Sequence, residues 1–139
     1  LLQAAGLSVC AVDLSEAMIA QVRPHVTEAL VGDVETLRLG RRFDAVVCLG
    51  VLLFLRDPEP CLANLAAHAR AGGVVIIETP RRSLGGHLYK VGYRLSRDLH
   101  IHLHDRALLD RIAARHGLAP QDQRRPFFHS LFRSWRKLN

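Results

Sequence analysis

The stretch VCAVDLSEAM, residues 9–18, decides the fold of this chain, because an apolar run there ends in an acid and is followed at once by a helix start. The run LSVCAV (7–12) is short, apolar and bounded by turn signals, which is typical of a strand buried on both faces. Ser15 is a helix-capping residue type and predicts a helix over SEAMIAQVR, which Pro24 ends or disrupts. A strand tip that carries Asp13 is poorly suited to core packing and well suited to binding a polar ligand.

Strands and helices alternate along the rest of the chain. LLQAAG (1–6) is typical of the last turn of a helix closed by Gly6. The alternation predicts an α/β fold, a Rossmann-like and mostly parallel sheet with flanking helices. The strand-like runs are EALVGD (28–33), the start of FDAVVCLGVLLFL (43–55) and VVIIET (74–79); the helix-like runs are PEPCLANLAAHARA (58–71), opened by Asp57 and Pro58 and ended by Gly72–Gly73, and DRALLDRIAARHG (105–117).

Length and composition are those of one globular domain. The chain has 139 residues, of which 49% are hydrophobic and 23% charged, and this balance excludes a disordered chain. No apolar run reaches the length of about 18 residues that a membrane-spanning helix needs. Cys10, Cys48 and Cys61 are odd in number and lie in apolar surroundings. They predict reduced core thiols in a cytoplasmic protein rather than a disulfide or zinc framework.

The formal charge of +6 is unevenly distributed, with most basic residues between 81 and 137. A basic tail of this kind fits nucleic acid, an anionic membrane or an acidic partner. A solvated basic face is the favoured interpretation, so a nucleic-acid partner is not expected.

The ends of the first two strands carry groups suited to a nucleoside. In open parallel sheets, ligands bind beyond the carboxyl ends of the strands. Asp13 there can accept two hydrogen bonds from ribose hydroxyls, a geometry that serves NAD and S-adenosylmethionine equally; a capping or surface role is the alternative. Asp33 can accept a hydrogen bond from an adenine amino group, and Val34 offers an apolar face. Gly50 ends the third strand and lets a ligand approach the backbone.

Four motifs in order, VDLSEAM, GDVETL, FDAVVCLGVLLFLRDP and RAGGVVIIETP, resemble class I S-adenosylmethionine-dependent methyltransferases. The small-molecule branch that includes ubiquinone and menaquinone biosynthesis enzymes is the most similar. The resemblance covers residues 1–80 well and 100–118 more loosely. It implies methyl transfer from S-adenosylmethionine to a small-molecule acceptor, at oxygen or carbon. It also implies that Asp13 binds the ribose, that Leu14 borders the adenine, that Asp33 and Val34 hold the adenine edge and face, and that Leu49 and Gly50 lie near the methionine portion.

The sequence departs from the family at two places. The glycine-rich loop that normally follows the family's first strand is absent, and LLQAAG resembles the helix just after it. We therefore expect an N-terminally truncated domain that lacks the strand between those of Asp13 and Phe43, has two exposed strand edges and binds cofactor weakly alone. Phe54 stands where many relatives carry His.

Residues 81–104 are expected to form a lid or substrate loop, because Pro80, Gly85, Gly86 and Gly92 punctuate the segment. In HIHLH (100–104) the three histidines would share one face of an extended chain. A surface or capping role is favoured for them over a base or substrate contact, and a metal site is the weakest option, so no metal is expected. Methyl transfer needs orientation more than a nucleophile or a triad. The weak catalytic candidates are therefore His100, His102, His104 and Tyr89, with Tyr93 as a further substrate contact.

Residues 105–139 are expected to hold a helix and then either the last strands or an amphipathic helix. LAPQDQ (118–123) fits an edge strand. FFHSLFRSWRKL (127–138) has Phe128, Leu131, Phe132 and Trp135 at helical spacing, so it fits either a final strand or a basic helix on a membrane surface. Packing on the sheet is favoured, and peripheral membrane contact is the alternative.

Two other functions remain open from the sequence. One is a nicotinamide-dependent oxidoreductase, although Tyr89 and Lys90 are adjacent and so lack the YxxxK spacing of short-chain dehydrogenases. The other is a non-catalytic interaction module that docks through its basic tail.

Overall fold

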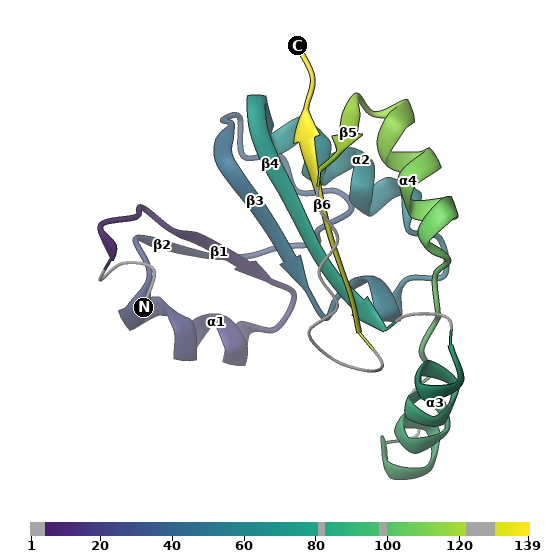
Figure 1. Cartoon of the computed structure of the whole chain (residues 1–139). Coiled ribbons are helices and arrows are strands. Elements are labelled where there is room, and N and C mark those ends of the chain that lie inside the picture. Colours follow the sequence, from purple (N-terminus) through teal and green to yellow (C-terminus); the bar gives the residue numbers. More distant parts are fainter. Residues whose placement is uncertain (1–4, 81–82, 98–99, 122–129) are drawn as a thin grey trace. The chain divides into compact units, whose positions relative to one another are not determined.

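The computed structural model describes residues 5–80, 83–97, 100–121 and 130–139 (Figure 1). The chain divides into two compact units, Leu1–Arg38 and Leu39–Asn139, and each is described by itself.

The first unit is a βαβ arrangement. Strands β1 (Cys10–Asp13) and β2 (Glu28–Val31) pair in parallel, and helix α1 (Glu16–Val22) lies between them in the sequence. The hydroxyl of Ser15 accepts a hydrogen bond from the Met18 backbone N–H at 3.3 Å, which confirms the predicted cap. Pro24 lies in the short 3₁₀ helix η2 (Arg23–His25), directly after α1.

The prediction that the first strand is buried on both faces is wrong for β1. Val12 and Asp13 are exposed, and Cys10 and Ala11 are half-buried. Among the residues that the structure describes, β1 pairs only with β2. The apolar run LSVCAV therefore predicts the strand correctly but not the burial of its side chains.

The second unit contains a four-stranded sheet in the order β3-β4-β6-β5. Its strands are β3 (Phe43–Leu49), β4 (Ala69–Pro80), β5 (Leu118–Pro120) and β6 (Ser130–Lys137). β3 and β4 are parallel, whereas β6 runs antiparallel to both of its neighbours. β6 is thus the one reversed strand of this sheet, and the predicted α/β fold with a mostly parallel sheet is confirmed.

Within the described ranges β3 pairs only with β4.

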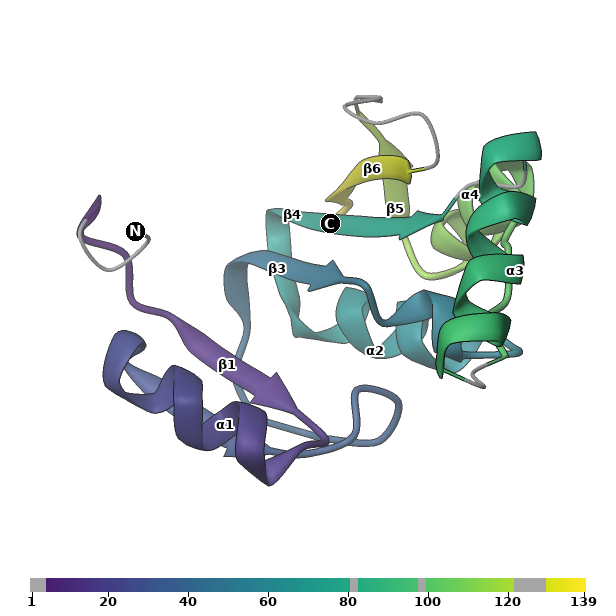
Figure 2. The ribbon, with the colours of Figure 1, turned by 90° about the horizontal axis from the view of Figure 1, so that it is seen from below.

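Helices α2 (Glu59–His68) and α4 (Arg106–Arg115) of the second unit cover one face of its sheet. Helix α2 packs on β3 and β4, and helix α4 packs on α2 and β5 (Figures 1 and 2). A carboxylate oxygen of Asp105 accepts a hydrogen bond from Ala107 N–H at 2.7 Å and caps α4. Gly117 ends α4 with a φ of 70°, as predicted. The buried side chains between sheet and helices include Cys48, Cys61, Leu62, Leu65, Val75, Ile77, Leu109, Ile112, Leu131 and Trp135.

Strand β4 begins five residues earlier than the sequence predicts, and α2 ends at His68 instead of continuing to the glycine pair. Ala69 already has extended backbone angles, φ −82° and ψ 133°. A Cβ on Gly73 would lie 2.9 Å from the Arg70 carbonyl oxygen and 3.0 Å from that of Asp44. Gly73 therefore serves the close approach of β3 to β4 and does not end a helix.

The prediction of a loop over residues 81–104 is wrong for most of that segment. Residues Leu84–Arg97 form helix α3. Its glycines suggested a turn, but Leu84, Leu88, Val91 and Leu95 recur at helical spacing, and this periodicity is the better indicator.

The amphipathic-helix alternative for the C-terminal segment is wrong, because residues 130–137 form β6. Every second side chain from residue 131 to 135 is buried, namely Leu131, Arg133 and Trp135, as in a strand with one covered face. Phe128 lies outside the described residues. The edge strand predicted over LAPQDQ is confirmed as β5, which in the described part of the chain pairs with β6 alone.

Candidate functional site

Asp13 and Asp33 lie at the same end of the two-stranded sheet in the first unit. Asp13 is the last residue of β1 and pairs in register with Val31, the last residue of β2. Asp33 follows Val31 by two residues, and the Gly32 backbone N–H donates a 3.0 Å hydrogen bond to the Asp13 carbonyl oxygen. The parallel register therefore brings the two acids to one edge, as the sequence predicts.

Both carboxylates are held in the same local way. Asp13 Oδ1 accepts a hydrogen bond from the Ser15 backbone N–H at 2.8 Å, and Asp33 Oδ1 accepts one from Glu35 N–H at 2.8 Å. Each is an Asx turn, in which an Asp side chain bonds the backbone two residues on. Within the described residues no hydrogen bond or ion pair to Oδ2 of either carboxylate is found. Each carboxylate is thus oriented by one oxygen and keeps the other for a ligand.

The neighbouring apolar candidates differ in exposure. Leu14 is exposed directly after the β1 tip, and Val34 is half-buried beside Asp33. An exposed leucine next to a carboxylate offers the combination that a nucleoside needs, an apolar surface for the base and an acceptor for hydroxyls.

Leu49 and Gly50 belong to the second unit, at the carboxyl end of β3. Leu49 is exposed, and it pairs in register with Glu78 of β4. Gly50 has a φ of 67°, and its N–H donates a 3.3 Å hydrogen bond to the Glu78 carbonyl oxygen. Among the described residues, no atom lies within 4 Å of a Cβ built on Gly50. The left-handed backbone is therefore what calls for a glycine at this position.

A family model described as "Methyltransferase domain" matches residues 1–123 of the chain. The chain belongs to the methyltransferase-domain family. The recognition made from the four sequence motifs is thereby confirmed, and the nicotinamide-dependent alternative loses its support.

The curated relatives match only part of the chain. The ubiquinone biosynthesis O-methyltransferase of Coxiella burnetii (strain Dugway 5J108-111) is 29% identical over 93 residues, which are 62% of this chain and 40% of that protein. A dTDP-3-amino-3,4,6-trideoxy-alpha-D-glucopyranose N,N-dimethyltransferase of Streptomyces venezuelae is 36% identical over 72 residues, which are 48% of this chain and 30% of the relative. The matched region thus spans less than half the length of these relatives.

Solved structures of methyltransferases share the fold. Magnesium protoporphyrin IX methyltransferase from Synechocystis PCC 6803 with bound SAH aligns with a TM-score of 0.76 and 21% identity, over 98% of this chain and 67% of that one. A TehB-like SAM-dependent methyltransferase from Corynebacterium glutamicum aligns with a TM-score of 0.71 and 21% identity, over 98% and 71%. At this identity the likeness shows the fold alone, and the fold is that of SAM-dependent methyltransferases.

The three histidines of residues 100–104 have different environments. His104 is buried, and its Nε2 lies 2.9 Å from the Leu52 carbonyl oxygen and 3.0 Å from that of Leu55. These carbonyls flank the 3₁₀ helix η3 (Leu52–Phe54), so the His104 ring holds that turn in place. Because carbonyl oxygens only accept hydrogen bonds, Nε2 is the donor in both contacts, and this donation from a buried ring favours a structural role for His104.

His100 and His102 are the remaining histidine candidates. His100 is exposed, and His102 donates its backbone N–H to the Leu53 carbonyl oxygen at 2.7 Å. Burial lowers the pKa of the His102 ring, and the positive charges of His104, Lys90 and Arg56 lower it further. The His102 imidazole is therefore neutral near pH 7, which is the state that accepts a proton.

Tyr89 and Tyr93 lie one turn apart on α3, with ring centroids 4.8 Å from each other. Both side chains are half-buried. The sequence brings these two candidates together because residues four apart share one face of a helix.

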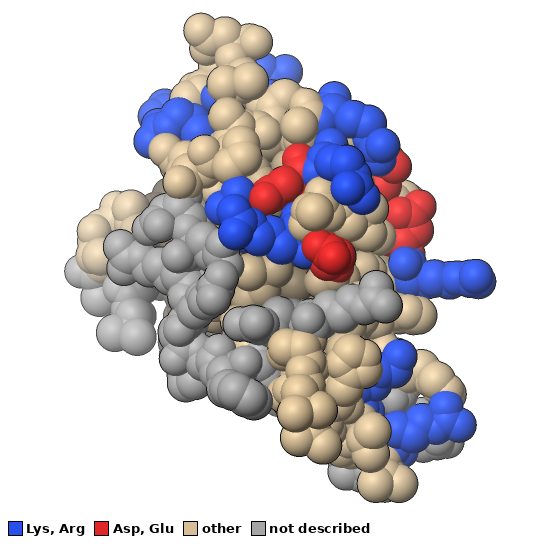
Figure 3. All heavy atoms as spheres, turned by 45° about the vertical axis from the view of Figure 1, so that its right-hand side comes forward, with Lys and Arg blue, Asp and Glu red and all other residues tan. Residues whose placement is uncertain are grey.

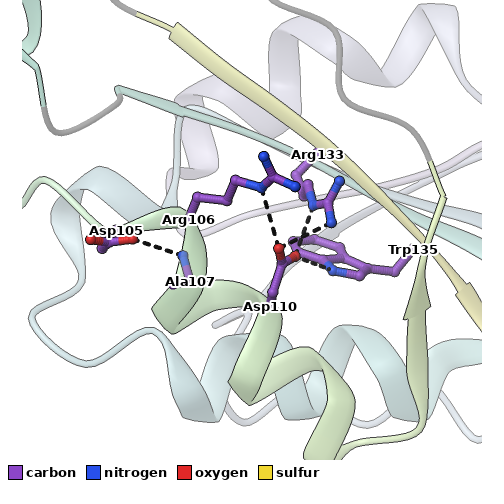
Figure 4. Close-up of polar contacts among 6 residues, drawn as sticks. All are labelled: Asp105, Arg106, Ala107, Asp110, Arg133 and Trp135. Carbon is purple, nitrogen blue, oxygen red and sulfur yellow. Dashed lines mark hydrogen bonds and ion pairs between the residues drawn. The ribbon is translucent and has the colours of Figure 1, made fainter.

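A polar cluster that the sequence analysis does not predict links α4 to β6 (Figure 4). Asp110 Oδ1 accepts hydrogen bonds from Arg133 Nε at 2.8 Å and Trp135 Nε1 at 2.9 Å, and Asp110 Oδ2 accepts one from Arg133 Nη2 at 3.0 Å. Arg106 adds a 3.4 Å contact. Every acceptor position is used inside the cluster, so its role is structural.

Within residues 5–80, 83–97, 100–121 and 130–139, no group of three or more His, Cys, Asp or Glu side chains is placed to hold a metal ion. No helix within those ranges is both long and apolar enough to span a membrane.

Proposed function

We propose that the protein containing this chain transfers a methyl group from S-adenosylmethionine to a small-molecule acceptor. Family membership supports the reaction type, and the relatives named above are O- and N-methyltransferases. The observation that carries the cofactor assignment is the pair of carboxylates at adjacent parallel strand ends, each held by an Asx turn with a second oxygen left to accept a hydrogen bond.

The chain's own residues fit the adenosyl group in the following way. Asp13 would accept hydrogen bonds from the ribose hydroxyls, and the exposed Leu14 would border the adenine. Asp33 would accept a hydrogen bond from the adenine amino group, and Val34 would lie against the face of the ring. The assignment of Leu49 and Gly50 to the methionine portion stays a prediction from the sequence resemblance.

The cofactor supplies a methyl group already activated on a sulfonium. The remaining work for the protein is to orient the acceptor, exclude water and, for a hydroxyl acceptor, remove one proton. Among the sequence candidates, we assign the removal of that proton to His102, because its lowered pKa keeps the ring neutral near pH 7, whereas the Nε2 of His104 donates to two carbonyl oxygens. Tyr89 and Tyr93 are assigned to acceptor contact.

Calorimetric titration of the protein with S-adenosylmethionine and with its demethylated product tests the proposal. Asp13→Asn and Asp33→Asn keep an oxygen for the Asx turn and replace Oδ2 by an N–H donor, so each should weaken binding about tenfold or more. Asp57→Asn is the matched control, because Asp57 forms the same turn to Glu59 N–H at 3.0 Å and is not among the residues assigned to the cofactor. Equal affinity in all three variants would refute the assignment of the two acids. No heat from either ligand with the intact protein would refute the function itself.

A further inference from the structure

Helix α3 presents an apolar stripe to solvent. Leu84, Leu88, Val91 and Leu95 are spaced three to four residues apart and so lie along one side of the helix. Their relative exposures are 76%, 66%, 54% and 82%. An amphipathic helix of a soluble protein normally turns such a stripe toward its core. In α3 the stripe is the exposed side.

The opposite side of α3 is the one that is covered. Gly85 and Gly86 are buried at its first turn, and Tyr89 and Tyr93 are half-buried with their rings in contact. The stripe is therefore exposed because a different side of the helix is turned inward.

The charges of α3 are all of one sign. Residues 84–97 contain no Asp or Glu, and Lys90 and Arg94 are exposed. Arg94 follows Val91 by three residues and so borders the stripe, and Lys90 lies one turn before Arg94 on the same side of the helix. At the lower end of the molecule in Figure 3, where α3 lies in Figure 1, Lys and Arg side chains are seen beside residues of other types. A leucine-rich stripe bordered by cations, on a helix of low mean hydropathy, is the pattern of helices that lie in the interface of anionic membranes.

We propose that α3 is a docking helix for an anionic phospholipid surface. Leu84, Leu88, Val91 and Leu95 would enter the boundary between headgroups and acyl chains, and Lys90 and Arg94 would meet the lipid phosphates. The charge pattern favours a lipid surface over an acidic protein groove, since the cations border the stripe instead of forming a separate patch. The membrane contact considered for the C-terminal segment is thereby placed on α3, because residues 130–137 are a strand.

The proposal is independent of methyl transfer and is tested by flotation of the intact protein with vesicles. Vesicles of equal parts phosphatidylglycerol and phosphatidylcholine should bind the protein about tenfold more tightly than pure phosphatidylcholine, and about 0.5 M salt should remove most of that difference. Lys90→Glu with Arg94→Glu should abolish binding to the anionic vesicles. Arg56→Glu with Arg111→Glu, which makes the same charge change at exposed sites on other elements, should leave it within about twofold.

The apolar stripe is tested separately from the charges. Leu95→Gln should weaken vesicle binding severalfold, whereas Leu138→Gln, at another exposed leucine, should not. A tryptophan placed by Leu88→Trp should shift its emission to shorter wavelength when anionic vesicles are added, against the constant signal of the buried Trp135.

Three results would overturn the proposal. The first is that the protein does not bind anionic vesicles. The second is that the stripe and charge variants bind these vesicles as tightly as the unmodified protein. The third is that the protein self-associates through the stripe in sedimentation experiments and does not bind vesicles. The last would assign the stripe to a protein contact.

Discussion

Asp110 and Arg133 form a bidentate ion pair that joins α4 to β6, with Arg133 Nε 2.8 Å from Asp110 Oδ1 and Arg133 Nη2 3.0 Å from Oδ2. The Arg133 side chain is 5% exposed. Removing the carboxylate leaves the guanidinium as an unpaired buried charge. The resulting loss of folding stability is larger than the net stability that the intact ion pair contributes.

Replacing the carboxylate should therefore destabilise the fold strongly. We expect Asp110→Ala to lower the free energy of unfolding by about 3 kcal/mol, measured by urea denaturation. Asp105→Ala removes a carboxylate from the same helix but only a cap, and should cost about 1 kcal/mol. Equal losses in the two variants would contradict a special role for the ion pair.

Stability should also depend on the protonation of Asp110. Burial alone raises the pKa of this carboxyl, but hydrogen bonds from Arg133 and Trp135 and the charge of Arg133 outweigh burial and lower it. The unfolded chain therefore binds the proton more tightly than the folded chain does. The ionised Asp110 makes its full contribution to the free energy of unfolding above about pH 4, and this contribution is lost as the pH falls through the lower pKa of the folded state. Urea titrations between about pH 2 and 6 should show a steeper acid loss for the wild type than for Asp110→Asn.

His104 should prove to be a structural residue. Removing its ring leaves the carbonyl oxygens of Leu52 and Leu55 without their buried donor. His104→Ala should lower the free energy of unfolding by about 2 kcal/mol, and His100→Ala, at an exposed position, by less than about 0.5 kcal/mol. A His104 variant of unchanged stability that loses only activity would restore His104 as a catalytic candidate.

A side chain at Gly73, where β3 and β4 approach closely, should destabilise the fold. A Cβ there meets the carbonyl oxygens of Arg70, Asp44 and Phe43 at 2.9, 3.0 and 3.1 Å. Gly73→Ala should destabilise by about 2 kcal/mol in thermal unfolding. Gly92→Ala, inside α3 with no atom near its Cβ, should be neutral or stabilise by up to about 1 kcal/mol. The reverse order of the two effects would contradict the close approach.

His102 should titrate at lower pH than an ordinary histidine. Its ring resonance in NMR should have a midpoint below about 6.5, because burial and the nearby cations disfavour the charged form. Arg56→Gln should move the midpoint upward, and the urea-unfolded chain should titrate near the ordinary value. A folded midpoint at or above 6.5 would remove the physical argument for His102 as the base.

The parts of the fold that could be predicted are those set by local chemistry. Ser15 caps α1 because its hydroxyl reaches a backbone N–H three residues on, and Asp13 ends β1 because an acid follows an apolar run. Such relations need only neighbours in the sequence, so the elements of residues 9–49 and the acidic strand ends were predicted closely.

The remaining features depend on partners distant in the sequence. The contact of Asp110 with Arg133 spans 23 residues and exists only in the observed register of β6. Helix α3 is not predicted because Gly85, Gly86 and Gly92 each disfavour a helix, although the first two are buried in the folded chain. β6 was left ambiguous because Arg133, a charged residue on the covered face, breaks the apolar alternation that marks a strand.

The Asx turns at Asp13 and Asp33 have a consequence for the speed of recognition. Each carboxylate is already fixed in one rotamer by a backbone N–H at 2.8 Å, so an incoming nucleoside has little side-chain freedom left to freeze at these positions. Encounter with the two acids should therefore proceed without a slow rearrangement of either side chain, and differences in residence time among adenosyl ligands should arise in dissociation.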